Sequence, residues 1–213
     1  MRVPNHNKER LDRSYALESN VHADKQQTVS NGPARVNNTD PPVWTEVPMQ
    51  TDTGQQALRI TYQSSHEFET TQARLDEQIP LLDPLVSLDL VLRHASWDEV
   101  ESTISAYLGP TGFVALARID QGALLSLSGE PLGATRYLVG NPLLARRVLG
   151  ADPAVALYAP FGVAVFADRA GVVQVSYDHP SSLFATCGTK EITDIGRELD
   201  DRIRSAVVSA CSA

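Results

Sequence analysis

The sequence predicts an α+β domain, in which helices pack on one face of a small, mostly antiparallel sheet. Two alternating apolar stretches, 161–168 and 172–177, are separated only by Arg169-Ala170-Gly171, which is typical of an antiparallel hairpin. The other strands are not regularly separated by crossover helices, so a doubly wound parallel sheet is disfavoured. A long amphipathic segment near the C-terminus supplies a covering helix. The expected order is β-α-β-β-α-β-β-α-α, with about four strands.

The chain divides by composition into three parts. Residues 1–56 are polar and rich in Asn and Gln, which predicts a disordered or arm-like tail. Trp44 and its apolar neighbours are the exception, and they could dock as a short arm on this domain or on a partner. Residues 57–83 are expected to be a linker, with one possible short strand where Leu58, Ile60 and Tyr62 alternate and only weak helical spacing after it. Residues 84–213 form the expected compact domain.

The first half of that domain opens with an expected strand over 84–92, where Val86, Leu88, Leu90 and Leu92 share one face. Ser96 and Glu99 have the spacing of a capping box and begin a helix that ends at Gly109-Pro110. Further strands are expected over 112–119 and 134–139, with an ambiguous segment that could hold one helical turn between them.

The second half begins with Asn141-Pro142, a strong N-cap followed by a proline at the first helical position, which predicts a short helix over 142–149. The hairpin described above follows, and Asp178-His179-Pro180 begins another short helix. The last helix is expected from Thr189 to about Cys211. Its apolar stripe includes Ile192, Leu199 and Ile203, and its expected solvent side includes Glu198, Asp200, Asp201, Arg202 and Arg204.

Composition excludes several classes of function. The net charge is −8 and the three lysines are scattered, so there is no basic face for nucleic acid. The longest purely apolar run, 154–159, is too short to cross a bilayer. Cys187 and Cys211 lie 24 residues apart without a metal-binding or disulfide pattern, and no cofactor motif is present. A cytoplasmic protein without metal or cofactor is expected.

Four short motifs occur in order: GFVALARID over 112–120, YLVGNP over 137–142, Ala159-Pro160, and VSYDHP over 175–180. In this order they resemble the bacterial domain-of-unknown-function family 302, over roughly residues 85–210. The resemblance implies a small α+β domain that associates as a dimer and has no settled activity. Many members carry a histidine after the Ile-Asp step, where this chain has Gln121. A role that rests on that imidazole is therefore not expected here.

Tyr177, Asp178 and His179 are the strongest catalytic candidates. A carboxylate beside an imidazole could position a general base, and the phenol could donate a hydrogen bond to a developing oxyanion. Capping of the helix that begins at Pro180, with Tyr177 packed in the core, explains the same residues without catalysis and is favoured.

Arg118, Asp120, Tyr137 and Asn141 are candidates for ligand binding. Asn141 lies before a helix whose backbone N–H groups could meet an anion, although capping alone is favoured. Arg118 and Asp120 could join a polar cluster with Glu130 and Arg136, or form only surface ion pairs.

Two functional hypotheses follow. One layer of helices leaves the second face of the apolar sheet to be covered. The favoured hypothesis is therefore a non-catalytic homodimer that binds a small or apolar ligand, or a protein partner, through that face. The alternative is a cofactor-independent enzyme that performs acid–base chemistry on a small organic molecule with Tyr177, Asp178 and His179, to which Arg118 could contribute.

Overall fold

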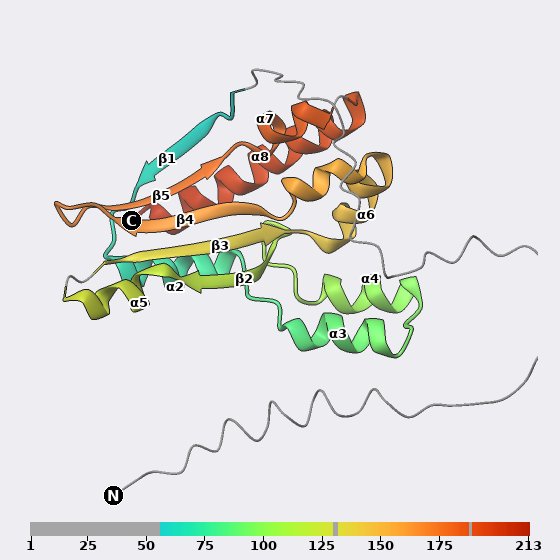
Figure 1. Ribbon diagram of the computed structural model, residues 1–213, viewed down its shortest axis with the longest axis horizontal. Helices are drawn as coiled ribbons and strands as arrows, with labels where there is room; N and C mark the ends of the chain where they lie inside the picture. The colour runs from blue at the N-terminus through green and yellow to red at the C-terminus, as the bar shows by residue number, and fades with distance from the viewer. Residues whose placement is uncertain (1–55, 130–131, 188) are drawn as a thin grey trace, which may run out of the picture. The chain divides into compact units, whose positions relative to one another are not determined.

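The computed structural model describes residues 56–129, 132–187 and 189–213. This part of the chain forms one five-stranded sheet in the order β1-β5-β4-β3-β2, in which every neighbouring pair is antiparallel (Figure 1). The strands are β1 (Arg59–Gln63), β2 (Val114–Asp120), β3 (Ala134–Gly140), β4 (Phe161–Ala167) and β5 (Val173–Asp178). The predicted α+β fold is confirmed.

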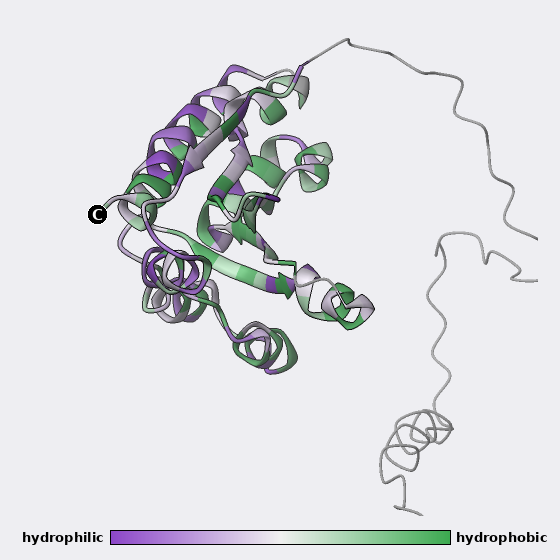
Figure 2. Cartoon of the chain, turned by 90° about the vertical axis from the view of Figure 1, so that its left-hand side faces the viewer, coloured by the Kyte–Doolittle hydropathy of each residue, from purple (hydrophilic) through white to green (hydrophobic). Residues whose placement is uncertain are grey.

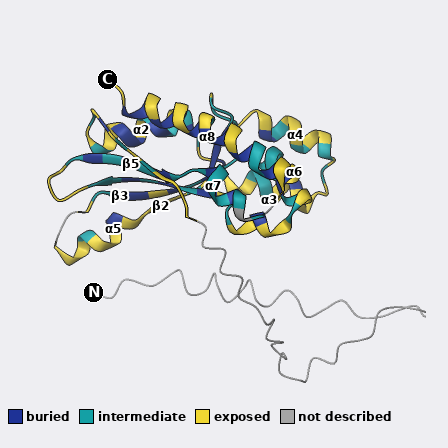
Figure 3. Ribbon diagram, turned by 90° about the horizontal axis from the view of Figure 1, so that it is seen from above, coloured by how far each residue is buried: buried dark blue, intermediate teal, exposed yellow. Residues whose placement is uncertain are grey.

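Helices α2 and α8 lie along one side of the sheet, and α5 lies toward the other side (Figure 3). The α-helices are α2 (Phe68–Gln78), α3 (Pro84–Leu92), α4 (Trp97–Ser105), α5 (Gln121–Leu125), α6 (Pro142–Ala151), α7 (Pro180–Phe184) and α8 (Lys190–Cys211). Short 3₁₀ turns are η1 (Ser126–Ser128), η2 (Pro153–Leu157) and η3 (Ala185–Cys187).

The main core lies between the sheet and α2 and α8. In β4, Phe161, Val163 and Val165 are buried, while the residues between them are only partly buried. The same alternation in β5 places Gln174, Ser176 and Asp178 on the face of the sheet that α2 and α8 do not cover. This is called the open face below. Figure 2 shows the matching pattern in α8, which turns its hydrophobic side to the sheet and its hydrophilic side outward.

Several local sequence signals are confirmed. The Ser96–Glu99 capping box is present at the start of α4, and the side chain of Asn141 accepts hydrogen bonds from the first turn of α6. The β4–β5 turn places Gly171 at φ +80°, and the Asp168 carboxylate accepts the backbone N–H groups of Ala170 and Val172. Turn and cap chemistry therefore predicts these boundaries well.

The strand expected over 84–92 is wrong, because this segment is helix α3. Asp83 accepts the N–H of Leu85 at 2.9 Å, and Pro84 occupies the first helical turn. This is the same cap-and-proline arrangement that begins α6. The alternation of apolar residues was misleading because nearly every position of α3 is apolar, and only Leu90 is buried.

The segment expected as a linker belongs to the packed structure. The short strand is found as β1, which pairs with β5 at the edge of the sheet, and α2 follows it. Leu75 of α2 is fully buried in the main core. The observed order is therefore β-α-α-α-β-α-β-α-β-β-α-α. The expected tail, with Trp44, lies outside the described residues apart from Gln56.

Candidate functional site

The open face of the sheet holds a depression of about 560 Å³. It spans β1, β5, β4 and β3, and the segment before β4 closes one end of it. The strand side chains that line it are on the face away from α2 and α8: Arg59, Thr61, Arg136, Ala164, Phe166, Ser176 and Asp178. Tyr158, from the segment before β4, also lines it. Leu157, a residue that is 79% exposed, also lines the depression.

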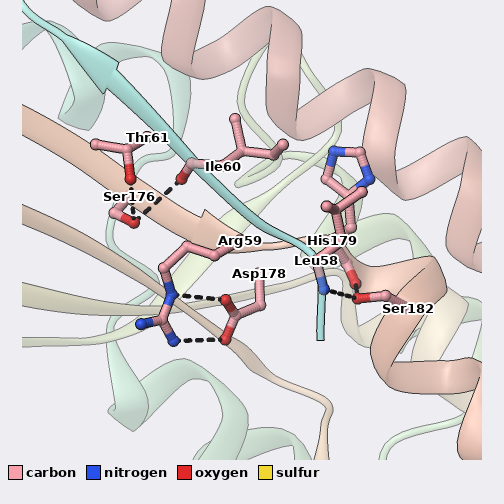
Figure 4. Close-up of polar contacts among 8 residues, drawn as sticks. All are labelled: Leu58, Arg59, Ile60, Thr61, Ser176, Asp178, His179 and Ser182. Carbon is pink, nitrogen blue, oxygen red and sulfur yellow. Dashed lines mark hydrogen bonds and ion pairs between the residues drawn. The ribbon is translucent and has the colours of Figure 1, made fainter. Parts of the chain in front are cut away.

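Arg59 and Asp178 form the most regular polar contact of this depression. They are register partners on β1 and β5, and the guanidinium donates to both carboxylate oxygens, at 2.8 Å from Nε and 3.1 Å from Nη2 (Figure 4). This bidentate geometry is the strongest form of an arginine–carboxylate contact. The hydrogen bonds to Asp178 raise the pKa of Arg59 above its ordinary value.

A pair of hydroxyl groups lies beside this ion pair. Thr61 and Ser176 are register partners, and their side-chain oxygens are 3.0 Å apart (Figure 4). Ser176 also donates to the backbone carbonyl of Ile60 at 3.1 Å. The depression therefore has one wall that can both donate and accept hydrogen bonds.

Arg136 is the second cation of the depression. Its guanidinium lies over Gly162 of the neighbouring strand, where a Cβ would stand 3.3 Å from both Nε and Nη2. The absence of a side chain at residue 162 therefore lets the guanidinium lie close to the sheet. Within the described ranges, no Asp or Glu forms an ion pair with Arg136.

The three predicted catalytic residues divide between the two faces of the sheet. Asp178 points to the open face, whereas the ring of His179 is directed to the helical side (Figure 4). Tyr177 is buried on that helical side, and its ring stacks on His179 with centroids 6.0 Å apart. The structure thus brings Tyr177 and His179 together but separates them from the Asp178 carboxylate.

A different carboxylate meets His179. Asp200 of α8 is only 6% exposed, and its Oδ2 lies 3.5 Å from His179 Nδ1. Asp200 also accepts the backbone N–H of Ser181 at 3.0 Å and a hydrogen bond from the Ser181 hydroxyl. His179 is the N-cap of α7 but makes no side-chain cap hydrogen bond, so Asp200 satisfies this helix end instead. The expectation that Asp200 lies on the solvent side of its helix is therefore wrong.

Both buried tyrosines are held in their neutral form. No hydrogen-bond partner is found for the hydroxyl of Tyr137 or Tyr177 among the described residues. Burial raises the pKa of both phenols well above the ordinary value, with a smaller contribution from Asp76 at Tyr137 and from Tyr62 at Tyr177. Neither phenol is therefore a ready proton donor at neutral pH.

The four predicted ligand-binding residues do not form one site. Arg118 pairs with Asp76 of α2 at 2.8 Å and lies 5.9 Å from the ring centre of Tyr137. Asp120 caps α5 by accepting the N–H of Ala123. Arg118 and Tyr137 are thus brought together on the helical side, whereas Asp120 has a structural role elsewhere.

Asn141 lies at a second, apolar cavity of about 360 Å³ beneath α6. Its amide oxygen caps α6, and its Nδ2 donates to the carbonyl of Gly112 at 2.9 Å. The walls of the cavity are almost entirely carbon and include Phe113, Val139, Ala145, Val148, Leu149, Phe184, Ile195 and Leu199. Both Pro160 and Phe161 line this cavity as well as the open-face depression.

Sequence reasoning missed Arg59 and Asp200, and it weighed Arg136 only as part of another cluster. The contacts of Arg59 and Asp200 join residues 119 and 19 positions apart, so they depend on strand register and helix packing. Among these residues, only the position of Arg136 has a local sequence signal, which is Gly162. A glycine within an apolar strand indicates that another group approaches the backbone closely.

Other kinds of site are not found in the described ranges. No three His, Cys, Asp or Glu side chains there gather as they would around a metal ion. No helix in the same ranges combines the length and apolar character needed to span a bilayer.

Comparison with known proteins gives a family and a fold. The family model described as domain of unknown function DUF302 matches residues 89–210. No curated protein matches the chain. Among solved structures, the crystal structure of an uncharacterized conserved DUF302 protein from Bacillus stearothermophilus is similar in fold, with a TM-score of 0.52 and 18% identity. That match covers 72% of this chain and 98% of the other. The chain therefore belongs to the DUF302 family of domains of unknown function.

Proposed function

We propose that this domain is a non-catalytic binding protein that takes a small-molecule ligand on the open face of its sheet. The observation that carries the proposal is the depression of about 560 Å³ on that face, which is lined by Arg136 as well as by the Arg59–Asp178 pair. Concave sites that combine apolar walls with a few polar groups are the usual places for small ligands.

Binding is favoured over acid–base catalysis because the acid and base candidates do not converge. General acid–base chemistry needs its groups within hydrogen-bond reach of one substrate. Here Asp178 lies on the open face, whereas His179 and Asp200 are largely buried on the helical side, with side chains only 14% and 9% exposed.

We also propose that the domain is a homodimer. Several large apolar side chains on β2, α5 and η1 are exposed next to one another in sequence: Ile119, Leu124, Leu125 and Leu127. Leu127 is 82% exposed and Leu124 is 73% exposed. Exposed apolar groups that gather in this way are typical of interaction surfaces. The double variant Leu124→Glu/Leu127→Glu should be monomeric in light scattering, whereas Leu157→Glu, at another exposed leucine, should remain dimeric. A wild-type monomer at micromolar concentration would refute the dimer.

A cytoplasmic location is part of the proposal, since the buried Cys211 thiol needs no oxidising compartment. Fractionation of the producing cells should recover the protein with cytoplasmic markers.

The ligand site is tested by native mass spectrometry of the purified full chain, followed by a thermal-shift screen of small molecules. Ala164→Phe places a ring in the depression without altering the helical side, and it should abolish ligand binding while the fold is retained. Ala170→Phe, in the exposed β4–β5 turn, is the matched control and should bind as the wild type does. Equal binding by Ala164→Phe and the wild type would overturn the proposed site.

A further inference from the structure

The charged groups of the open-face depression leave one positive charge unbalanced. Two arginines, Arg59 and Arg136, and one aspartate, Asp178, line it. Both carboxylate oxygens of Asp178 already accept hydrogen bonds from Arg59. The guanidinium of Arg136 is therefore the cationic group available to a ligand. The full chain carries a net charge of −8, so the depression has the opposite sign of charge to the chain as a whole. A single planar guanidinium matches a carboxylate, which it can bind through two parallel hydrogen bonds.

In contrast to the charged depression, the cavity beneath α6 is apolar. It measures about 360 Å³, and its walls are aliphatic and aromatic side chains from β3, β4, α6 and α8. An apolar cavity of about 150 Å³ is enough to take up benzene, so this one has room for a larger hydrocarbon group. Asn141, the amide at this cavity, is already engaged by α6 and Gly112.

The two spaces meet where β4 begins, with the depression on the open face of the sheet and the cavity on the side of α8. Pro160 and Phe161 line both of them, and Gly162, over which the Arg136 guanidinium lies, is the next residue. Two residues of extended chain span roughly 7 Å, so the guanidinium of Arg136 and the ring of Pro160, which lines the apolar cavity, are within reach of one small molecule.

From this juxtaposition we propose that the ligand is an amphiphilic carboxylate. Its carboxylate binds the guanidinium of Arg136, and its hydrocarbon part passes Pro160 into the cavity beneath α6. This inference rests on the proposed function, because it names the class of ligand for the same open-face site.

Calorimetric titration of the full chain with octanoate, butyrate and 1-octanol tests the two halves of the ligand separately. Octanoate should bind about 10- to 100-fold more tightly than 1-octanol, the range expected for a hydrogen bond to a charged group. It should bind on the order of 100-fold more tightly than butyrate, since each buried methylene strengthens binding about fourfold.

Two variants locate these effects. Arg136→Gln should remove the advantage of octanoate over 1-octanol and leave the affinity for 1-octanol unchanged, whereas Arg169→Gln, at the exposed β4–β5 turn, should change neither. Ala145→Phe fills the apolar cavity and should remove the advantage of octanoate over butyrate. If its melting curve shows that it does not fold, Leu149→Phe serves the same purpose.

The outcomes separate this inference from the proposed function. If 1-octanol binds as tightly as octanoate and Ala164→Phe abolishes both, the open-face site stands and the anionic class of ligand is refuted. If butyrate binds as tightly as octanoate, or if Ala145→Phe and Leu149→Phe leave the affinity for octanoate unchanged, the apolar cavity holds no part of the ligand. If none of the three compounds binds, the inference is overturned, while native mass spectrometry still decides the proposed function.

Discussion

Asp200 should be one of the most costly polar residues to replace. Its buried carboxylate accepts the N–H and the hydroxyl of Ser181 and lies 3.5 Å from His179. Each lost hydrogen bond to a charged group costs about 1.5–3 kcal/mol when its partner stays buried. Ser181 is only partly buried, so water can replace part of the contact. We therefore expect Asp200→Ala to reduce the free energy of unfolding by about 2–4 kcal/mol.

The comparison of two variants at this position identifies the cause. Asp200→Asn keeps an oxygen for the Ser181 N–H, but it replaces the oxygen that accepts from the Ser181 hydroxyl with an NH2 group, which can donate to that hydroxyl instead. It should therefore cost about 1 kcal/mol, near the value of one neutral hydrogen bond. Urea unfolding followed by circular dichroism measures both variants. Asp201→Ala, at the exposed neighbouring position, is the control and should behave as the wild type. If Asp200→Ala unfolds at the same urea concentration as Asp201→Ala, Asp200 does not cap α7.

Three further predictions concern the packed core. Leu75→Ala should cost about 2–5 kcal/mol in urea unfolding because Leu75 is fully buried, whereas a linker residue would cost almost nothing. Gly196→Ala should cost about 1–3 kcal/mol, because its Cβ would stand 2.6 Å from Ser181 Cα and push α7 away from α8; an unchanged melting temperature would contradict this. Tyr137 and Tyr177 should ionise only on unfolding. Their folded pKa lies above the unfolded value of 10.0, so the stability that these two phenols contribute is constant below that pH and falls as pH rises past it. Tyrosinate absorbance that reaches its full value while circular dichroism stays native would contradict this.

The sequence predicted those elements whose ends carry their own chemistry. Ser96, Asn141 and Gly171 each satisfy a backbone requirement within a few residues, so the helices and the hairpin they mark are confirmed. Helix α3 was mistaken for a strand because a nearly continuous apolar segment fits both periods, and Asp83 was not considered as its cap. Helix α2 was missed because two of its buried residues, Thr71 and Gln72, are polar.

The candidate site was less predictable than the fold. That the helices leave one sheet face open follows from counting layers, and the structure has such a face, on which the depression lies. Which side chains meet on that surface depends on register: Arg59 faces Asp178, and Thr61 faces Ser176, only because β1 pairs with β5 in one alignment. A shift by one residue would send each of these groups to the opposite face.

Strand β1 has a practical consequence for anyone who trims this protein. The family model begins at residue 89, so a boundary drawn from it would remove β1 and α2. The shortened chain would leave the backbone N–H and C=O groups of β5 without their partners on β1, and it would remove the fully buried Leu75 from the main core. Exposed strand edges recruit other chains. Insolubility of such a fragment would therefore reflect where it was cut, and a start upstream of Arg59 is the safer choice for expression.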